Sequence, residues 1–461
     1  MSAFDVVVVG GGAAGLTAAR EAARRGARTA LVSDGPLGGD CTHTGCVPSK
    51  ALLAAAERGL SFDEAMAAVR GAVERVARTE NAPVLQAEGI QVIAGRARLA
   101  RAGVVEVGDA RLRSSRIVLA TGAGPVVSPV AGLAEARPLT TESVFGQRER
   151  PDRLAVLGGG AVGVELAQAF AMLGVAVTMI EAAGRLLPGE EPEASAALAE
   201  ALGECGVDVR CRTALEAVDE SDGRWCLRLA GGGNVAADRV LVAAGRAPAT
   251  AGLGLAEVGV VVDEQGYVRT DASLATTVPG IWAVGDVTGR MPFTHAAAHM
   301  ARIAVRNALS PWARVAKQRF DPTPIPWVTF THPEVARVGM TEAEAAGHGG
   351  RVAYVPLSAV DRAVVTGATR GFVKLIAGPR PGLGNVGGGR LLGATIVAPR
   401  AGELIHEVAL AMRARLFTGR LAQTTHAYPT WSTAVQQAAA QFFMTYDGRT
   451  ARRARPGGEP A

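Results

Sequence analysis

Residues 5–15 read DVVVVGGGAAG, and this stretch decides the fold of the first part of the chain. Its four consecutive valines are typical of a buried parallel strand. The glycines that follow occupy the positions of a G-x-G-x-x-G turn as Gly10, Gly12 and Gly15, and an alanine-rich helix is predicted over 16–25. In such a turn the first glycine permits a tight bend, the second lets a pyrophosphate approach the backbone, and the third lets helix and strand pack closely. The stretch therefore predicts a βαβ unit that binds a dinucleotide.

The same pattern recurs later in the chain. A β-type run over 154–157 is followed by Gly158, Gly160 and Gly163 at the same positions, and a further strand ends at Glu181. A single turn of this kind is weak evidence, since it could be a glycine-rich turn without a ligand. Two of them, each between a strand and a helix, predict two bound dinucleotides.

The residue at the end of the second strand of each unit indicates how the unit binds the ribose of its dinucleotide. Glu181 lies 18 residues after Gly163, where a carboxylate can accept from a ribose 2′-hydroxyl. This favours NADH, and NADPH stays possible because Arg185 is near. In the first unit Ser33 stands where an acid is expected and Asp34 comes one residue late, so either could hold the ribose.

Length and composition exclude several classes of protein. A chain of 461 residues with 48% hydrophobic residues suggests about three folded domains. No apolar run is long enough for a membrane span, and the first residues show no secretory signal, so we expect a cytoplasmic protein without a membrane partner. The basic residues are dispersed, which argues against a nucleic-acid partner.

The predicted fold class is α/β, with two doubly wound Rossmann-like nucleotide-binding domains and a C-terminal α+β domain. We expect the first domain in residues 1–150 and 271–320, the second in 151–270, the third in 321–445, and a disordered tail in 446–461. In the third domain, strands are predicted over 327–330, 371–376 and 391–397, and helices over 403–413 and 433–442.

Residues 38–50 read GGDCTHTGCVPSK and need a chemical explanation. A metal site would need more ligands, since only His43 is close, and we expect no metal. Buried structural thiols are a second reading. We favour a third, a redox-active disulfide between Cys41 and Cys46. Pro48 suits the first turn of a helix, which places Cys46 near a helix N-terminus, where a thiolate is stabilised.

Taken together, these segments resemble the class I flavin-dependent pyridine nucleotide–disulfide oxidoreductases, over about residues 4–443. The family's landmarks occur in the family's order and at its spacing. They are Gly10–Gly15, Cys41–Lys50, Ala120–Gly122, Gly158–Glu165, Ala244–Arg246, Val284–Asp286 and Phe330–Glu334.

The resemblance implies that FAD binds the first unit and NADH or NADPH the second. Asp286 would contact the ribityl chain of FAD, and a helix beginning near His295 and Ala296 would point at the flavin ring. The remaining cofactor-binding positions that it implies are Gly10, Gly12, Gly15, Ser33, Asp34, Gly39, Thr121, Gly122, Gly158, Gly160, Gly163, Glu181, Gly245 and Arg246.

It also implies a path for electrons, from nicotinamide to flavin to disulfide. Cys46 would face the flavin, Cys41 would meet the acceptor, and Lys50 would pair with Glu165 near the flavin. The remaining three cysteines match no motif and are expected to be structural. In this family the C-terminal domain makes a homodimer, which we expect here too.

The chain departs from the family in its C-terminal domain. Disulfide-reducing members carry a His-Pro-Thr-x-x-Glu motif, whose histidine is the acid–base group for the interchange thiol. Here Tyr428 takes the place of the histidine and Thr433 that of the glutamate. A phenol and an imidazole differ by roughly 3.5 pKa units, or about 5 kcal/mol, so Tyr428 is a poor base at neutral pH. Acid–base work by Tyr428, a substitute role for His426, and mere packing of Tyr428 are all open.

Tyrosine at this position resembles the mercuric reductase branch and the soluble transhydrogenases. Mercuric reductases, however, carry an extra C-terminal cysteine pair, and this chain has no cysteine after Cys226. The transhydrogenases lack the second redox cysteine, which is present here. We therefore expect an NAD(P)H-dependent reductase whose acceptor is a soft metal ion or a small disulfide or electrophile. The alternatives are a diaphorase or transhydrogenase that uses flavin alone, or dihydrolipoamide dehydrogenase activity.

Overall fold

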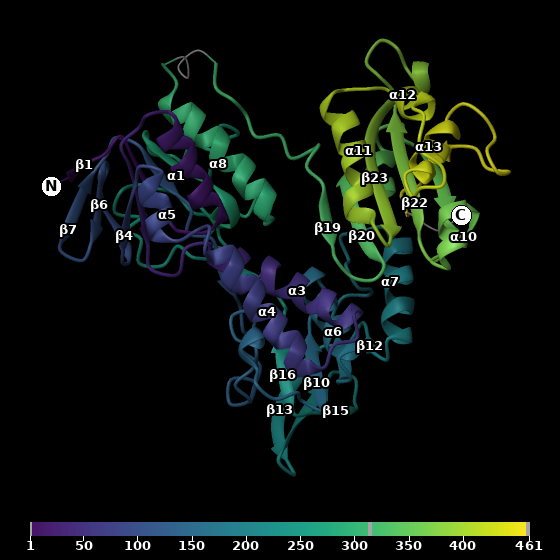
Figure 1. Cartoon of the computed structure of the whole chain (residues 1–461), viewed down its shortest axis with the longest axis horizontal. Coiled ribbons are helices and arrows are strands. Elements are labelled where there is room, and N and C mark those ends of the chain that lie inside the picture. Colours follow the sequence, from purple (N-terminus) through teal and green to yellow (C-terminus); the bar gives the residue numbers. More distant parts are fainter. Residues whose placement is uncertain (1, 312–315, 458–461) are drawn as a thin grey trace. The chain divides into compact units, whose positions relative to one another are not determined.

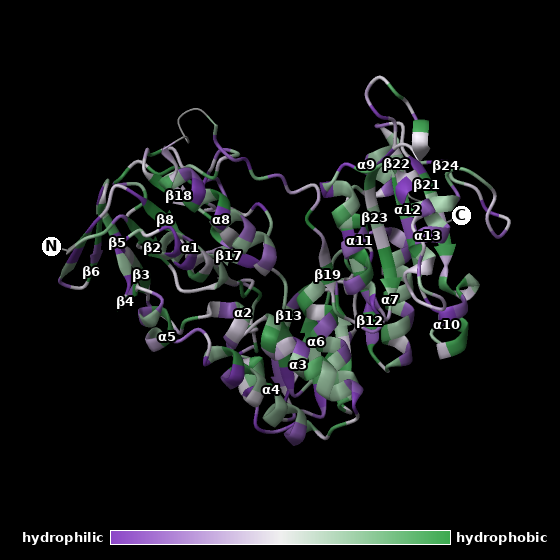
Figure 2. Ribbon diagram, turned by 45° about the horizontal axis from the view of Figure 1, so that its top comes forward, coloured by the Kyte–Doolittle hydropathy of each residue, from purple (hydrophilic) through white to green (hydrophobic). Residues whose placement is uncertain are grey.

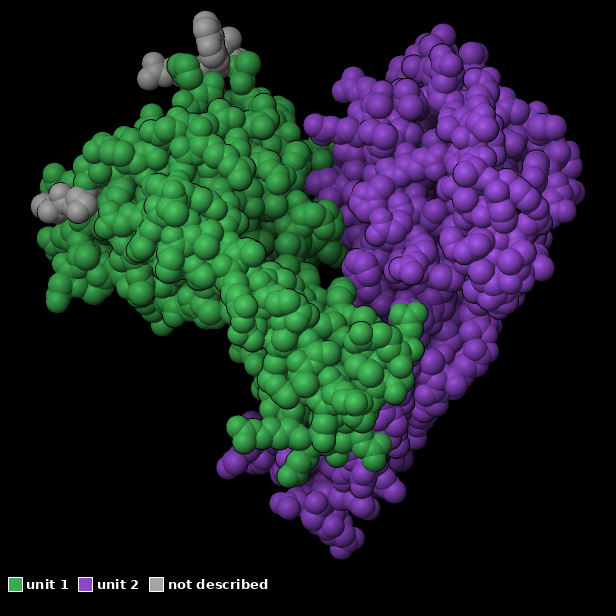
Figure 3. Space-filling model, viewed as in Figure 1, with its two compact units in different colours: residues 1–128, 139–150, 244–321 green, residues 129–138, 151–243, 322–461 purple. Residues whose placement is uncertain are grey.

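The computed structural model describes residues 2–311 and 316–457, which form two compact units (Figure 3). Unit 1 contains the chain up to residue 128 together with 139–150 and 244–321, and unit 2 contains 129–138, 151–243 and the chain from 322 onwards. Residues 244–270, which we expected in the second nucleotide-binding domain, pack with unit 1. The physical reason is that β17 (Arg246–Pro248) pairs antiparallel with β9 (Ala123–Pro125). A division into three domains stays a prediction.

Unit 1 is built on a parallel sheet in the order β18-β8-β2-β3-β4. Its strands are β2 (Val6–Val9), β3 (Thr29–Ser33), β4 (Ile90–Ala94), β8 (Ile117–Leu119) and β18 (Ile281–Ala283). All four valines of β2 are buried, as predicted for a strand covered on both faces. Helices α1 (Ala13–Arg24) and α8 (Thr294–Leu309) pack side by side (Figure 1). Strands β8 and β18 are green, the colour of hydrophobic residues, in Figure 2.

The rest of unit 1 follows β3. The chain forms the short helix α2, then the longer α3 and α4, and a capping box at Ser61 and Glu64 begins α4. These elements are α2 (Gly39–His43), α3 (Cys46–Glu57), α4 (Phe62–Ala77) and α5 (Ala82–Ala87), and the 3₁₀ turns η1 (Val144–Gly146) and η2 (Gly285–Thr288). A second sheet has the order β1-β7-β6-β5, with β1 (Ser2–Ala3), β5 (Ala97–Arg101), β6 (Val104–Val107) and β7 (Ala110–Arg113).

Unit 2 begins with the second nucleotide-binding sheet, parallel and in the order β12-β11-β10-β16. Its elements are β10 (Arg153–Leu157), α6 (Ala161–Met172), β11 (Ala176–Ile180), α7 (Pro192–Glu204), β12 (Asp208–Arg210) and β16 (Arg239–Val242). An antiparallel sheet of β13 (Leu215–Ser221), β14 (Arg224–Leu229) and β15 (Asn234–Ala237) is inserted before β16. Both predicted α/β nucleotide-binding folds are therefore confirmed.

The C-terminal part of unit 2 is an antiparallel sheet in the order β19-β20-β23-β22-β21-β24, with helices against it. Its strands are β19 (Trp327–Thr329), β20 (Glu334–Gly339), β21 (Arg351–Pro356), β22 (Phe372–Gly378), β23 (Arg390–Ala398) and β24 (Arg452–Arg453). Its helices are α9 (Glu342–Ala346), α10 (Asp361–Thr366), α11 (Ala401–Arg413), α12 (Thr418–Gln423) and α13 (Thr433–Ala440), with 3₁₀ turns η4 (Leu357–Ala359) and η5 (Val386–Gly388). The predicted α+β class is confirmed, although β20 and β21 were not foreseen.

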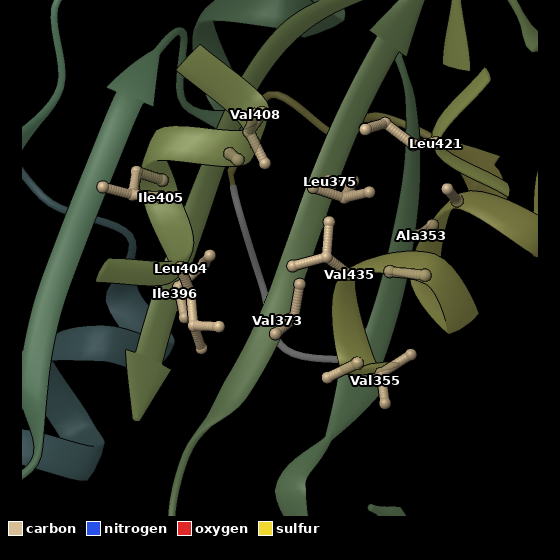
Figure 4. Close-up of a cluster of buried hydrophobic side chains, with 14 of the residues drawn as sticks. Ala353, Val355, Val373, Leu375, Ile396, Leu404, Ile405, Val408, Leu421 and Val435 are labelled. Carbon is tan, nitrogen blue, oxygen red and sulfur yellow. The ribbon is translucent and has the colours of Figure 1, made fainter. Parts of the chain in front are cut away.

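The core of this sheet lies between its strands and the helices α11 and α13. In Figure 4 the side chains of Val373 and Leu375 on β22 lie among Ile405 and Val408 of α11 and Val435 of α13. Successive residues of a strand point to opposite faces, so Lys374 faces the other side of the sheet.

Lys374 is fully buried and stands in a cluster of charged side chains. Its Nζ lies 3.2 Å from Glu191, 2.6 Å from Glu193 and 3.0 Å from Glu342. Glu191 and Glu193 come from the start of α7, and Glu342 from α9. The cluster thus links α7, of the second nucleotide-binding part, to the C-terminal sheet. Its buried cation, Lys374, is paired with carboxylates, as a buried charge requires.

The expected disordered tail is a wrong prediction for the residues that the structure describes. Strand β24 pairs antiparallel with β21, and Arg452 Nη2 donates to Glu342 Oε2 at 3.1 Å. The backbone N–H of Arg455 also donates to Glu342, at 3.1 Å. The polar sequence of this segment shows no hydrophobic periodicity. The segment is ordered because β24 pairs with β21 at the edge of the sheet, and because Arg452 and Arg455 donate to the buried Glu342 carboxylate. Residues 458–461 of the predicted tail lie outside the described part of the chain.

Candidate active site

The first glycine turn has the geometry that its sequence predicts. Gly10 has φ +112°, and a Cβ on Gly15 would lie 1.8 Å from the carbonyl oxygen of Gly10. Both positions therefore demand glycine for packing. Gly12 differs, since a Cβ there would meet only the Cα of Gly39, at 4.0 Å, and it immediately precedes α1. A Cβ on Gly39 would in turn lie 2.7 Å from the Cα of Gly12. The open side of Gly12 leaves room for a phosphate at the helix N-terminus.

The second turn repeats this division of roles. Gly158 has φ +108°, and a Cβ on Gly163 would lie 1.9 Å from the oxygen of Gly158, while a Cβ on Gly160 would meet nothing within 4 Å. Glu181 ends beside the turn, where its carboxylate accepts from the backbone N–H groups of Gly159 and Ala183, both at 2.5 Å. The carboxylate is thereby fixed next to the open glycine.

The two candidate ribose residues of unit 1 differ in their surroundings. The Ser33 hydroxyl donates to the oxygen of Gly35 at 3.0 Å and lies so close to Gly11 that a Cβ there would be 2.5 Å away. Asp34 is exposed. Ser33 thus borders the glycine turn, and which of the two holds the ribose stays a prediction.

Two polar atoms near the ends of these strands are buried without a hydrogen-bond partner among the described residues, the Thr121 hydroxyl and Nε of Arg246. Asp286, in η2, is partly buried beside Arg246. Burial raises its pKa, opposed by the charge of Arg246. Buried polar atoms of this kind require a partner. Their position beside the open Gly12 turn fits FAD, for which Thr121, Arg246 and Asp286 were predicted to be ligands.

The neighbouring motif glycines shape the same region. Gly122 has φ +76° and its carbonyl accepts from Ala249 at 3.0 Å, and Gly245 has φ +143°. Both conformations favour glycine. They bring Arg246 across to the oxygen of Ala123, to which it donates a hydrogen bond.

Cys41 and Cys46 come together in unit 1. Cys41 lies in α2, and Cys46 is the first residue of α3. Their thiols are within hydrogen-bonding reach, and this hydrogen bond, burial and the charge of Cys46 raise the pKa of Cys41. Cys46 differs from Cys41 in standing at the first position of a twelve-residue helix. The N-terminus of α3 favours a negative charge on its sulfur.

Helix α8 also begins at the thiol pair, through a residue that the sequence did not single out. The Oγ1 of Thr294, its first residue, lies 3.3 Å from Cys46 Sγ. The ring of His295 stacks on Phe293 with centroids 5.8 Å apart, and Ala296 is buried. The start of α8 at His295 and Ala296 is thus placed beside Cys41 and Cys46, whereas the contact of α8 with flavin stays a prediction.

Lys50 and Glu165 lie in different units. Lys50 is one helical turn after Cys46 in α3. Glu165 is buried in α6, where its Oε1 accepts from the backbone N–H of Phe330 at 2.8 Å. The predicted Lys50–Glu165 pair stays a prediction.

Tyr428 is an exposed phenol paired with an acid. Its side chain is 75% exposed, and its hydroxyl donates to Asp361 Oδ2 at 2.8 Å. The hydrogen bond to Asp361 and the charge of that carboxylate raise the pKa of Tyr428. Tyr428 therefore stays protonated and can donate a hydrogen bond but cannot serve as a base near neutral pH.

His426 is held in place by other groups. Its Nε2 lies 2.9 Å from Glu407 Oε1 and its Nδ1 2.9 Å from the oxygen of Thr424, and its side chain is only 6% exposed. Thr433, at the position of the family's glutamate, donates to the oxygen of Thr430 at 2.6 Å. Whether Tyr428 or His426 takes part in acid–base chemistry stays a prediction.

His43 is the residue that could have added a ligand to the two cysteines in a metal site. The Nε2 of His43 lies 2.9 Å from the oxygen of Leu37. Among the described residues, no group of three His, Cys, Asp or Glu side chains could hold a metal ion. Within the same residues, no helix is both long and apolar enough to cross a membrane.

Comparisons with known proteins agree with this geometry. The family model described as pyridine nucleotide-disulphide oxidoreductase matches residues 4–301, and the model of that family's dimerisation domain matches residues 325–439. A mercuric reductase of Streptomyces lividans is 37% identical, over 95% of this chain and 96% of its own length. A dihydrolipoyl dehydrogenase of Chlamydia muridarum is 34% identical, over 93% and 94%. The Cu(II) complex of the HOCl-induced flavoprotein disulfide reductase RclA from Escherichia coli superposes with a TM-score of 0.86, at 30% identity, over 95% of this chain and 99% of that one.

The chain belongs to the class I pyridine nucleotide–disulphide oxidoreductases. It is an enzyme of the FAD-dependent flavoprotein disulfide reductase family, which uses NAD(P)H, and it carries that family's dimerisation domain. Its relatives include two different activities at similar identity, so similarity alone does not choose an acceptor.

Proposed function

We propose that the chain passes electrons from NAD(P)H through FAD to a Cys41–Cys46 disulfide, and from there to a soft metal ion or a small disulfide or electrophile. The observation that carries the proposal is the thiol pair itself, which lies at the N-terminal ends of α3 and α8. Two helix N-termini and the Thr294 hydroxyl favour a negative charge on Cys46. Such a charge forms on a cysteine sulfur when the disulfide is reduced.

When bound, FAD supplies a two-electron carrier between the nicotinamide and the disulfide. The residues of this chain hold the reactants and move the protons. Gly12 and Gly160 leave the backbone open to the two dinucleotides. Asp286 would accept a hydrogen bond from the ribityl chain of FAD. With a small disulfide as acceptor, the Cys41 thiolate attacks one sulfur and releases the first thiol. Cys46 then attacks Cys41, releases the second thiol and re-forms the disulfide, so that NADH and a proton yield two thiols and NAD⁺.

The absence of an imidazole at position 428 bears on the acceptor. The hydrogen bond with Cys46 and burial raise the pKa of Cys41, so attack on a disulfide needs a base to take its proton, and Tyr428 is not such a base. A soft metal ion displaces the proton by binding sulfur, so it needs no base. A soft metal ion is therefore a better acceptor here than lipoamide, and dihydrolipoamide dehydrogenase activity is disfavoured.

We propose NADH as the preferred donor. The Glu181 carboxylate beside the second glycine turn would repel a 2′-phosphate and accept from a 2′-hydroxyl. Arg185, the nearby cation considered for NADPH, donates to the oxygens of Pro188 at 2.7 Å and Glu190 at 2.9 Å. The ratio of kcat/KM for NADH and NADPH tests this, and a ratio below one would overturn it.

We also propose that the protein works as a cytoplasmic homodimer. Large apolar side chains are exposed on the dimerisation domain, among them Val365 at 71%, Leu410 at 67% and Val386 at 65%. A second copy of the domain would cover such side chains. Sedimentation equilibrium should give twice the mass of the chain.

A diaphorase or transhydrogenase that uses flavin alone is the second candidate, favoured by Tyr428 at the position of the family's histidine. Anaerobic titration with NADH separates the two. A long-wavelength thiolate–flavin band and uptake of more than two electrons would support the disulfide route. Simple bleaching with two electrons would support the second candidate, as would a Cys41→Ser variant that keeps full activity with the acceptor.

A further inference from the structure

Helix α2, which carries Cys41, is fixed by side chains. It has five residues, and so short a helix has little stability of its own. On one side the Thr42 hydroxyl donates to Glu80 Oε2 at 2.7 Å, and at its end His43 contacts the oxygen of Leu37 at 2.9 Å. The position of the Cys41 sulfur therefore depends on the contacts that these neighbours make with α2.

The first turn of α2 is held by a residue that lies 206 positions further along the chain. Arg246, at the start of β17, donates hydrogen bonds through Nη2 to Asp40 Oδ2 and to the oxygen of Ala123. Its own backbone is fixed too, since the Tyr267 hydroxyl donates to the Arg246 oxygen at 3.2 Å. Asp40 precedes Cys41 directly, so this ion pair acts on the residue next to the thiol.

The Arg246 guanidinium also lies near Asp286, a residue predicted to bind FAD. Arg246 Nε lies 3.9 Å from Asp286 Oδ2, and the Arg246 side chain is 29% exposed. One cation is thus shared between Asp40 on the cysteine helix and the partly buried Asp286. Burial raises the pKa of Asp286, the charge of Arg246 lowers it, and the charge of Asp40 raises it.

We propose that Asp40 and Arg246 form a latch that positions Cys41 and links the cysteine helix to the cofactor site at Asp286. Both are positioning residues, because neither touches a reacting sulfur. Loss of the latch leaves α2 free to shift its first turn, and a displacement of about 1 Å at a reacting group can cost about 100-fold in rate. The proposal rests on the function proposed above, in which Cys41 meets the acceptor.

The test measures the alkylation of Cys41 and Cys46 by iodoacetamide in the reduced holoenzyme, with each labelled peptide quantified by mass spectrometry. Asp40→Asn and Arg246→Gln should each alkylate Cys41 at least 3-fold faster than the wild type, since a freed α2 exposes its sulfur. Cys46 in the same sample serves as the internal control. The double variant should match the single variants, because each single variant already breaks the Asp40–Arg246 ion pair. Asp40→Glu keeps the carboxylate and should restore much of the wild-type rate.

Either of two results would overturn the latch: a wild-type Cys41 rate in Asp40→Asn, or effects that add fully in the double variant. If Asp40→Asn fails to fold, the pH profile of Cys41 alkylation in Arg246→Lys replaces it, and an unchanged profile counts against the latch. Failure of the proposed function is seen separately, as full acceptor turnover by Cys41→Ser. The alkylation rates do not depend on turnover and still judge the latch in that case.

Discussion

The hydroxyl oxygen of Thr294 lies 3.3 Å from the sulfur of Cys46, although the two residues are 248 positions apart. Each is the first residue of its helix, α8 and α3. Two helix N-termini and a hydroxyl therefore meet at one sulfur. In a chain with tyrosine in place of the family's histidine, this is the arrangement that stabilises a thiolate without a nearby imidazolium.

Removing the Thr294 hydroxyl should make Cys46 less reactive. A hydrogen bond to a charged group contributes about 1.5 kcal/mol, which corresponds to about a tenfold change in the thiolate fraction. Thr294→Val should therefore slow the alkylation of Cys46 at pH 7 about tenfold in the reduced protein. Thr294→Ser keeps the hydroxyl and should react as the wild type does. Equal rates in the valine and serine variants would show that the hydroxyl does not act on the sulfur.

Placing an imidazole at position 428 should improve turnover of small disulfides. A general base of suitable pKa contributes about 100-fold or more, and Tyr428 is not such a base. We expect Tyr428→His to raise kcat/KM for lipoamide at least tenfold at pH 7.5. Tyr428→Phe is the matched control and should stay near the wild-type value. A large loss in the phenylalanine variant would instead show that the phenol itself takes part.

The raised pKa of Tyr428 should depend on Asp361. The carboxylate accepts the phenolic hydrogen bond and its charge disfavours phenolate. Asp361→Asn should therefore move the pKa of Tyr428 down toward its ordinary value of about 10. NMR of ¹³C-labelled tyrosine can follow this titration, since the chain has only four tyrosines. An unchanged midpoint would mean that the pair does not persist in solution.

The buried charge cluster should be important for stability. Lys374→Met removes the cation that Glu191, Glu193 and Glu342 share, and breaking a buried ion pair typically costs about 3–5 kcal/mol. Urea unfolding should show a loss of this order. Arg78→Gln breaks the exposed pair with Glu74 and should leave the unfolding midpoint near that of the wild type. Similar midpoints for the two variants would contradict the expected contribution of the cluster to the free energy of unfolding.

Two glycines of the first turn should separate cofactor binding from folding. A Cβ on Gly12 would meet only the Cα of Gly39, at 4.0 Å, so Gly12→Ala should reduce the FAD content of the purified protein and leave its fold intact. A Cβ on Gly15 would lie 1.8 Å from the oxygen of Gly10, so Gly15→Ala should lower folding stability by several kcal/mol. Circular dichroism and bound-flavin absorbance distinguish these outcomes. Full FAD content in Gly12→Ala would remove the evidence for a phosphate at that turn.

Local sequence determined the two nucleotide-binding folds and the cysteine pair. The valine run, the glycine spacing and the helix that follows act over a few residues, and the structure reproduces them as β2 and α1. Pro48 stands in the first turn of α3, which places Cys46 at the helix end as its position predicts. These features follow from backbone conformation and burial periodicity, which adjacent residues fix.

Only the tertiary structure decided which distant groups meet at the site. The pairing of β17 with β9 brings Arg246 to Asp40, and the packing of α8 brings Thr294 to Cys46. The antiparallel addition of β24 places Arg452 on Glu342, where the sequence predicted disorder. None of these contacts leaves a periodic signal, because the order of strands in a sheet depends on the burial of the whole chain. The sequence therefore located the candidate redox cysteines, and the tertiary structure decided which distant side chains lie beside them.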